Sequence, residues 1–365
     1  MSIFSWHKSW LALALMGSAC GADAAPAAMS GNGSVRQLAT SSTHSCAIRG
    51  DGLYCWGRNA SGELGDGTTT DSDSAVRALV AGDDVVEVGT HTSRTCVRRK
   101  NGEVACWGAN GHGQIGDGTR TAATTATTAQ GITDAHQLAV DDNSTCAVHG
   151  AEREVSCWGE SSMLKPDNGS LLPTKIPGML GVQQLRVGAF ASYCALDEAS
   201  EVQCFRIEDG RWSTPKVVDL PKVKTIAMPH PDYVCGNPES GGILCRSVVD
   251  STRVELPDSA GALALEAGSG GLVLCASYPE QAWRCWNLPS FTLPMMGVAD
   301  VAGQFPFQVY SDVPMKELAI AGFRVCVLRK DDSVACVDSA AEAEQAASLI
   351  AEMRIKLTVP VVGLP

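Results

Sequence analysis

Fourteen of the fifteen cysteines in this 365-residue chain fall into seven couples, whose two members are 9 to 11 positions apart. The first cysteines of successive couples are separated by 50, 50, 48, 41, 40 and 51 residues. A period of this length, present seven times, indicates one supersecondary unit stacked on copies of itself. The couples are Cys46 and Cys55, Cys96 and Cys106, Cys146 and Cys157, Cys194 and Cys204, Cys235 and Cys245, Cys275 and Cys285, and Cys326 and Cys336.

Within a couple, the residues between the cysteines predict a β-hairpin. In the first couple, two short apolar runs flank the turn Arg49–Gly52, and a Gly/Asp pair between such runs is typical of hairpins. Counted outward from the turn, Cys46 lies opposite Cys55, at a Cα separation of about 4.5–5.5 Å that suits a disulfide. The second couple is one residue longer, and its turn, Lys100–Gly102, can hold a three-residue loop. We therefore predict seven disulfides, one within each couple. The alternative is reduced core cysteines, which would have no reason to follow the turn lengths.

So many disulfides require an oxidising compartment, and the N-terminus has the features of an export signal. His7-Lys8 precedes the apolar run Trp10–Met16, which is too short to span a bilayer. Residues 17–20, Gly-Ser-Ala-Cys, resemble a bacterial lipoprotein signal, although that family prefers Leu where Gly17 stands. The alternative is ordinary cleavage after the A-x-A site that ends at Ala24, which would discard Cys20.

Cys20 is the one unpaired cysteine and lies where a lipoprotein signal is cleaved, so we expect it to be lipidated. The expected organisation is a signal peptide over residues 1–19, or to 24 under the alternative, a flexible tether over 20–33 and a propeller over 34–365. The expected location is extracytoplasmic: a cell-envelope lipoprotein, periplasmic or secreted.

Charge and composition exclude several function classes. A net charge of −12 argues against binding nucleic acid or anionic lipid through a basic face, so contact with a membrane is expected only through a lipid anchor at Cys20. The dense basic group Arg94, Arg98, Arg99 and Lys100 surrounds one hairpin turn and is interpreted as a solvated edge. Aromatic residues at 5% and charged residues at 19% suit short strands and turns better than helices.

The first two units share a motif after their second cysteine. It reads CWGRNASGELGDGT over Cys55–Thr68 and CWGANGHGQIGDGT over Cys106–Thr119. Together with the sequence His44–Ile48, this resembles the repeat of the regulator-of-chromosome-condensation family, and more closely its exported bacterial branch with a disulfide in each repeat. The resemblance implies a seven-bladed β-propeller, which agrees with the seven cysteine couples. It also implies a range of roles, because the family includes nuclear nucleotide-exchange factors and secreted inhibitors of β-lactamases.

The match is uneven along the chain. Cys-Trp-Gly is present in units one to three, whose tryptophans are Trp56, Trp107 and Trp158, and unit six has Cys285-Trp286-Asn287. In units four, five and seven the Trp position holds Phe205, Arg246 and Val337, and the Gly-rich loop is present only in units one and two.

The motif residues have structural explanations. We expect the Trp to fill the wedge between adjacent blades, and Asn59, Asn110, Asp66 and Asp117 to hydrogen-bond their own turns. The alternative, a calcium site, would need more carboxylates than the one in each Gly-Asp-Gly-Thr loop.

The ends of the repeat array predict how it closes. The first unit begins at Ser34, directly before its hairpin, without the segment that precedes other hairpins as Pro173–Pro177 or Thr214–Val218. The chain ends with a segment of this kind, Leu357–Pro365. We expect this C-terminal strand to complete the first blade and close the ring.

A short helix is also expected near the C-terminus. Ser339–Glu342 has capping-box spacing, and apolar residues then recur at helical spacing through Met353. Packing on the disc is its expected role, and partner binding is the alternative. The predicted fold is therefore an all-β, seven-bladed propeller closed by the C-terminal strand, with one short helix.

The common motifs of catalysis are missing. The sequence has no H-E-x-x-H, G-x-S-x-G, phosphate-binding Gly-Lys loop or C-x-x-C. Ser162–Lys165 matches S-x-x-K without its companion motifs, and the histidines show no paired metal spacing. We therefore predict no catalytic residue, cofactor or metal.

The predicted function is an exported, non-catalytic, monomeric scaffold that binds a protein or a glycan with a face of loops. A secreted enzyme inhibitor is a specific form of this scaffold. The alternative of another class is an extracytoplasmic enzyme whose site is assembled from several blades, and fold alone does not separate the two.

Arg211 and Trp212 are the candidate partner-binding residues. They lie in a connection that has diverged from the repeat, and Trp and Arg are the commonest anchors of interfaces. The alternative is that Trp212 packs between blades in place of the tryptophan that Phe205 replaces.

Overall fold

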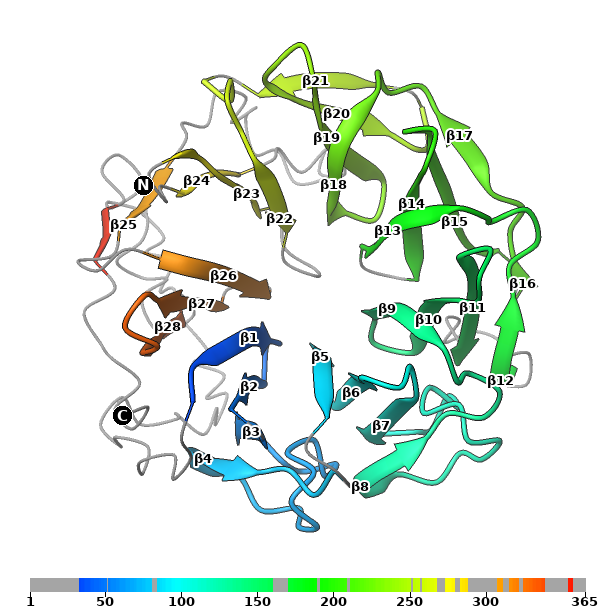
Figure 1. Ribbon diagram of the computed structural model, residues 1–365, viewed down its shortest axis with the longest axis vertical. Coiled ribbons are helices and arrows are strands. Elements are labelled where there is room, and N and C mark those ends of the chain that lie inside the picture. Colours follow the sequence, from blue (N-terminus) through cyan, green and yellow to red (C-terminus); the bar gives the residue numbers. More distant parts are fainter. Residues whose placement is uncertain are drawn as a thin grey trace, which may run out of the picture.

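The computed structural model describes residues 33–50, 52–80, 84–159, 170–188, 191–208, 211–250, 252–256, 258–267, 273–279, 283–287, 307–310, 315–321, 324–338 and 354–356. All the named secondary-structure elements in these ranges are β-strands. The strands form sheets that are arranged around a common centre (Figure 1). The prediction of an all-β propeller is confirmed. The predicted helix and Cys20 lie outside the described residues.

The described strands form seven sheets, here numbered one to seven in chain order. Sheets one to three each contain four strands that follow the chain order. Sheet one is Val35–Thr40 (β1), His44–Arg49 (β2), Gly52–Gly57 (β3) and Ser72–Arg77 (β4). Sheet two is Val85–His91 (β5), Arg94–Arg99 (β6), Val104–Gly108 (β7) and Ala123–Thr128 (β8). Sheet three is Ala135–Val140 (β9), Ser144–His149 (β10), Glu154–Gly159 (β11) and Ser170–Lys175 (β12).

The remaining sheets are less regular. Sheet four is Val182–Val187 (β13), Ser192–Asp197 (β14), Val202–Glu208 (β15), Arg211–Trp212 (β16) and Lys216–Val218 (β17), and sheet five is Val223–His230 (β18), Tyr233–Pro238 (β19), Ile243–Ser247 (β20) and Arg253–Leu256 (β21). Sheet six is Ala264–Ala267 (β22), Val273–Ser277 (β23), Trp283–Asn287 (β24) and Phe307–Tyr310 (β25), joined in parallel by Arg354–Lys356 (β29). Sheet seven has three described strands, Met315–Ala321 (β26), Arg324–Arg329 (β27) and Val334–Asp338 (β28).

The second and third strands of each sheet form the hairpin that carries a cysteine couple. In every couple the two cysteines are directly opposed in the antiparallel register. Their Cα atoms lie 3.9 to 4.1 Å apart, and each couple forms a disulfide. The bonds join Cys46 to Cys55, Cys96 to Cys106, Cys146 to Cys157, Cys194 to Cys204, Cys235 to Cys245, Cys275 to Cys285 and Cys326 to Cys336.

The predicted pairing is confirmed in all seven hairpins, because alternation along two antiparallel strands brings opposed side chains to the same face. The bonds lie in the interior of the sheets. Cys157 of sheet three and Cys245 of sheet five are fully buried, while Cys336 of sheet seven is half-buried. The Cα separations are somewhat shorter than the 4.5–5.5 Å expected from an ideal opposed pair.

In sheets one to six, the strand after the hairpin belongs to the same sheet, which corrects the unit boundaries expected from the sequence. Ser170–Lys175 pairs with β11 of the hairpin before it, and Lys216–Val218 likewise pairs with β15. These segments therefore end a unit instead of beginning one. Sheet one takes all four of its strands from residues 35–77, so it lacks no strand for the C-terminus to supply. Residues 357–365 lie outside the described residues.

Side chains on the first strands of sheets one to four and of sheet seven bond to the first strand of the next sheet. Gln37 accepts from the Val88 backbone N–H at 2.9 Å and donates to the Val88 carbonyl at 3.2 Å. Gln137 makes the same pair of bonds with Leu185, and Glu87 accepts from the Leu138 N–H at 3.0 Å. A first strand is an edge strand with unpaired backbone groups, and these side chains satisfy some of them. We call this set, with Gln184 and Glu317, the inner belt.

Tryptophans fill the wedges between sheets, as predicted. Trp107 and Trp158 are fully buried, and their indole N–H groups donate to the carbonyls of Glu63 and Gln114 in the Gly-rich loop of the preceding unit. A Cβ added to Gly65 would lie 2.5 Å from Nε1 of Trp107, so this glycine permits the loop to approach the indole.

The loop asparagines and aspartates have the predicted structural role. Asn59 is fully buried and accepts from the Leu64 N–H at 2.9 Å, while Asp66 accepts from the N–H and hydroxyl of Thr68 at 2.9 and 2.8 Å. Asn110 and Asp117 make the equivalent bonds in unit two. These side chains therefore hold the turns of the Gly-rich loops.

Candidate functional site

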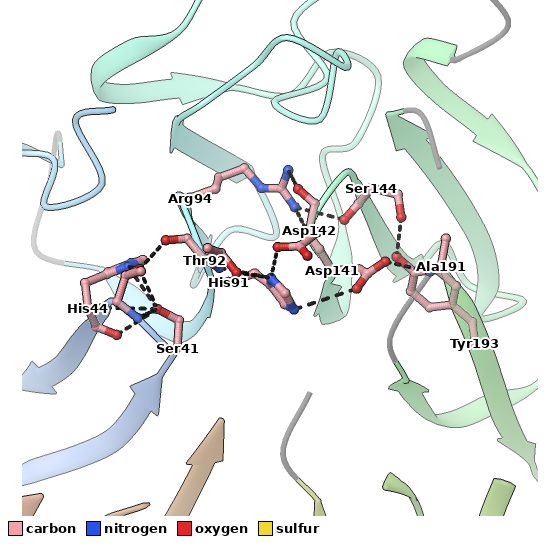
Figure 2. A network of polar contacts seen from close by, with 11 residues as sticks. Ser41, His44, His91, Thr92, Arg94, Asp141, Asp142, Ser144, Ala191 and Tyr193 are labelled. Carbon is pink, nitrogen blue, oxygen red and sulfur yellow. Dashed lines mark hydrogen bonds and ion pairs between the residues drawn. The ribbon is translucent and has the colours of Figure 1, made fainter. Parts of the chain in front are cut away.

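A polar network connects the loops between the first and second strands of sheets one to four (Figure 2). At its start, the hydroxyl of Thr43 donates to the carbonyl of Thr92, and Nε2 of His44 lies 2.8 Å from the hydroxyl of Thr95. Both contacts cross from sheet one to sheet two. The network continues through His91 and Arg94 into sheet three and ends at Tyr193 in sheet four.

His91 and two aspartates form the centre of the network. Nδ1 of His91 lies 2.5 Å from Oδ1 of Asp142, and Nε2 lies 3.7 Å from Oδ1 of Asp141. Burial raises the pKa of Asp141, and the charge of His91 and the Ala191 N–H only partly oppose this. Burial also acts to raise the pKa of Asp142, but the hydrogen bond and charge of His91 outweigh it and hold the pKa at about 2. The two neighbouring carboxyls therefore differ in their tendency to ionise.

Arg94 joins the network from the core side. It is 1% exposed, and its guanidinium donates to the carbonyl of Asp141 and, at 2.9 Å, to that of Ser144. Burial lowers its pKa to about 10, so the side chain is charged at neutral pH. On the far side, Oδ2 of Asp141 accepts from the Ala191 N–H at 2.6 Å, and the hydroxyl of Ser144 lies 2.8 Å from that of Tyr193. These contacts join sheets two, three and four.

A histidine beside carboxylates is the arrangement of many acid–base sites. Here Nε2 of His91 has no hydrogen-bond partner among the described residues. No described side chain is therefore placed for Nε2 of His91 to activate as a nucleophile. No group of three or more His, Cys, Asp or Glu side chains able to hold a metal occurs in the described ranges. About half of the named contacts between neighbouring sheets instead use a backbone atom as one partner. The arrangement accounts for cohesion between sheets.

Several network residues occupy equivalent positions in successive repeats, which could have been noticed from the sequence. Ser41, His91 and Asp141 each lie five residues before a first cysteine, and His44, Arg94 and Ser144 lie two before. The histidines are therefore repeat positions, but residue spacing does not show that different side chains at equivalent positions contact one another across sheets.

The structure places the predicted site residues Arg211 and Trp212 on β16, which pairs with the end of β15. Trp212 is half-buried, and its ring centroid lies 5.8 Å from those of Phe205 and Tyr193, in edge-on contact with both. This is the contact that the packing alternative requires. Arg211 is exposed. Partner binding by these two residues stays a prediction.

Comparison with known proteins now places the sequence. The profile described as "Regulator of chromosome condensation (RCC1) repeat" matches residues 35–63 and 92–114. The chain carries RCC1-type repeats.

Curated relatives agree with this assignment. The human E3 ubiquitin-protein ligase HERC2 is 29% identical over 210 residues, which are 52% of this chain and 4% of HERC2. The ultraviolet-B receptor UVR8 of Arabidopsis thaliana is 28% identical over 167 residues, 43% of this chain and 38% of UVR8. The chain thus spans only a small part of the length of these relatives.

Solved structures show the same fold. Prp20p of Saccharomyces cerevisiae, a protein with binding properties to Gsp1p and histones, is similar with a TM-score of 0.62, 16% identity and 86% coverage of both chains. The ectodomain of the receptor kinase CR4 from Physcomitrella patens has a TM-score of 0.55 and 20% identity over 84% of this chain and 74% of CR4.

The repeat pattern within the chain shows where one unit departs from the first three. In the wedge between sheets four and five, Arg246 stands in the Trp position. A pocket of about 280 Å³ lies there, between β14, β15 and β17 on one side and β18 and β20 on the other. We call it the wedge pocket. The described part contains no helix long and apolar enough to cross a membrane.

Proposed function

We propose that this chain is an extracytoplasmic propeller that binds a protein partner and performs no catalysis. The observation that carries the proposal is where apolar surface is exposed. Among the described residues, five of the six exposed large apolar side chains lie between residues 172 and 263, namely Leu172, Leu180, Val217, Val249 and Leu263. This region belongs mainly to the divergent units, and burial of these side chains under a protein partner would stabilise a complex. A glycan is the alternative ligand.

The disulfides support the extracytoplasmic location. Seven disulfides in one chain are typical of proteins that fold in an oxidising compartment. We propose that residues 1–19 are a signal peptide, that Cys20 becomes lipidated, and that 20–33 tether the propeller to the cell envelope. Metabolic labelling with a fatty-acid analogue tests the anchor. Label should enter the wild-type protein and be absent from Cys20→Ala, whereas label in both, or in neither, would contradict it.

We also propose that the folded part, residues 34–365, is a monomeric ring of seven blades. Contacts between sheets seven and one support this arrangement. Tyr54 and Trp56 of sheet one cluster with Cys326, Leu328 and Val334 of sheet seven, and Oε2 of Glu317 accepts from the Leu38 N–H. A ring leaves no sheet at an open end, which is how propellers protect their edges.

The binding proposal is tested with the full chain immobilised and exposed to an extracytoplasmic extract. We expect saturable capture of a defined protein, which is then purified and titrated against the chain. The same chain after reduction and alkylation should lose the interaction, because it would lose the constraints on its hairpins. A purified candidate that binds both forms equally, or capture of glycan alone, would overturn the proposal of a folded protein-binding surface.

The enzyme alternative makes a different prediction. The described group best suited to acid–base chemistry is His91 with Asp142, so an activity built on it should be lost in His91→Ala. Turnover of a substrate by the wild type, with no turnover by this variant, would replace the binding proposal.

A further inference from the structure

Among the four wedges between sheets one and five, three are filled by an aromatic residue that follows the second cysteine, and the fourth departs from this rule. In the wedges between sheets one and two and between two and three, a Gly-rich loop covers the indole of Trp107 or Trp158. Between sheets three and four, Phe205 is joined by Tyr193 and Trp212 in one aromatic cluster. Between sheets four and five, no aromatic residue follows the second cysteine, since Arg246 stands there. The wedge pocket is the space that results.

The pocket has an apolar wall and room for an aromatic group. Cys204, Val218, Met228 and Val248 give the pocket its apolar lining, while the rings of Tyr193 and Phe205, which stack at 5.5 Å between centroids, pack toward sheet three. A dry cavity of about 150 Å³ is known to hold benzene. The volume of about 280 Å³ therefore has room for a two-ring group such as indole.

The charges around the pocket favour an acidic neighbour of that aromatic group. Two of the lining cations are already paired: Arg246 with Asp219 at 2.5 Å, and Arg206 with Glu208 at 3.0 Å and with Asp232, outside the lining, at 3.9 Å. Lys216 is exposed and makes no ion pair with any described residue, so it leaves one net positive charge in the lining.

The strand that borders the pocket favours a polypeptide as the ligand. Lys216–Val218 (β17) lines the pocket and pairs with β15 alone among the described strands, so one of its edges is unpaired. Val217 on this strand is 64% exposed. An extended segment of a partner can add to such an edge through its backbone while one of its side chains enters a pocket beside it.

From these observations we propose that the wedge pocket binds an aromatic side chain of a protein partner, in the place that Trp107 and Trp158 occupy in their own wedges. A carboxylate of the same partner segment pairs with Lys216. This inference rests on the proposed protein-binding function and specifies where and how the partner is recognised.

Short peptides test the chemistry of recognition. The probes are acetyl-Glu-Trp-Glu-amide, acetyl-Glu-Ala-Glu-amide and acetyl-Lys-Trp-Lys-amide, titrated against the full chain by calorimetry or NMR. We expect the first to bind at least ten-fold more tightly than the other two. Equal affinity for all three, or no binding of the first at millimolar concentration, would overturn the inference. Indole-3-acetate that binds more tightly than the acidic peptide would assign the pocket to a small aromatic acid and would also overturn it.

Two variants locate the binding. Arg246→Trp restores the residue of the repeat and should fill the wedge, with loss of peptide binding and an unchanged or higher unfolding temperature. Lys216→Glu, on the surface, should lower the affinity for the acidic peptide at least three-fold and raise the affinity for the basic peptide. Lys222→Glu is the matched control, because Lys222 is exposed, lies after β17 and does not line the pocket. Unchanged binding in both pocket variants would refute the site.

The outcomes separate this inference from the proposed function. A partner captured equally well by the wild type and by Arg246→Trp would place the binding surface elsewhere on the propeller, with the proposed function intact.

Discussion

Glu317 on β26 accepts a hydrogen bond from the backbone N–H of Leu38 on β1, over 3.1 Å and between residues 279 positions apart. This contact joins the last described sheet to the first and belongs to the inner belt. Unlike Gln37 and Gln137, Glu317 has no N–H to donate in return. Burial raises its pKa to about 7, the Leu38 N–H opposes this, and the nearby charge of Glu266 adds to it.

The first prediction is that Glu317→Gln stabilises the protein at pH 8. A carboxyl whose pKa is higher in the folded state binds more protons there, so the wild type should lose stability as pH rises from about 4.5 through about 7. The amide avoids this loss and can accept from the Leu38 N–H. We expect a gain of about 1–3 kcal/mol at pH 8 and little change at pH 4.5, measured by urea unfolding at both pH values.

The matched control is Glu87→Gln, the same substitution in the same belt. Glu87 pairs with Arg98 at 2.7 Å, so its neutralisation should destabilise the protein at pH 8 by about 1 kcal/mol. If both substitutions changed the free energy of unfolding at pH 8 in the same direction, the interpretation would be contradicted.

The second prediction separates two reasons why a position requires glycine: a positive φ and the close approach of a neighbouring side chain. Gly65 has a φ of +70° and lies against Trp107, Gly131 has a φ of +81° with open space around it, and Gly111 has open space alone. Substitution by Ala should cost about 2–4 kcal/mol at Gly65, about 1 kcal/mol at Gly131 and almost nothing at Gly111. Thermal unfolding of the three variants gives the order, and a Gly65 variant as stable as the Gly111 variant would be inconsistent with the contact.

The third prediction concerns the disulfides. Each closes a short loop, so removal of one couple, as in Cys46→Ala with Cys55→Ala, should cost at most about 3 kcal/mol. Non-reducing peptide mapping of the wild type should find only linkages within couples. A linkage between two couples would contradict the register of the hairpins.

The fourth prediction is that Trp212→Ala lowers stability by about 2–3 kcal/mol, because Trp212 is half-buried against Phe205 and Tyr193. Arg211→Ala, at the exposed neighbouring position, should leave stability unchanged within about 0.5 kcal/mol. A loss of partner affinity in both variants at unchanged stability would instead identify the pair as an interface anchor.

The sequence predicted the parts of this molecule that depend on local spacing. Opposed cysteines such as Cys46 and Cys55 follow from the hairpin turn between them, and a period of 40 to 51 residues indicates stacked units. It misplaced the unit boundary, since a single edge segment such as Ser170–Lys175 is equally suited to begin one sheet or to end another. Only the observed pairing settles which neighbour takes it.

The sequence by itself therefore determined the repeat, its disulfides and the propeller class, because these follow from residues close together in the chain. Only the tertiary structure decided what happens between sheets. In the folded protein His91 contacts Asp142, Glu317 bonds to Leu38, and a pocket lies beside Arg246. Such contacts join residues tens to hundreds of positions apart, and the side chains involved differ from one wedge to the next, so no periodic pattern records them.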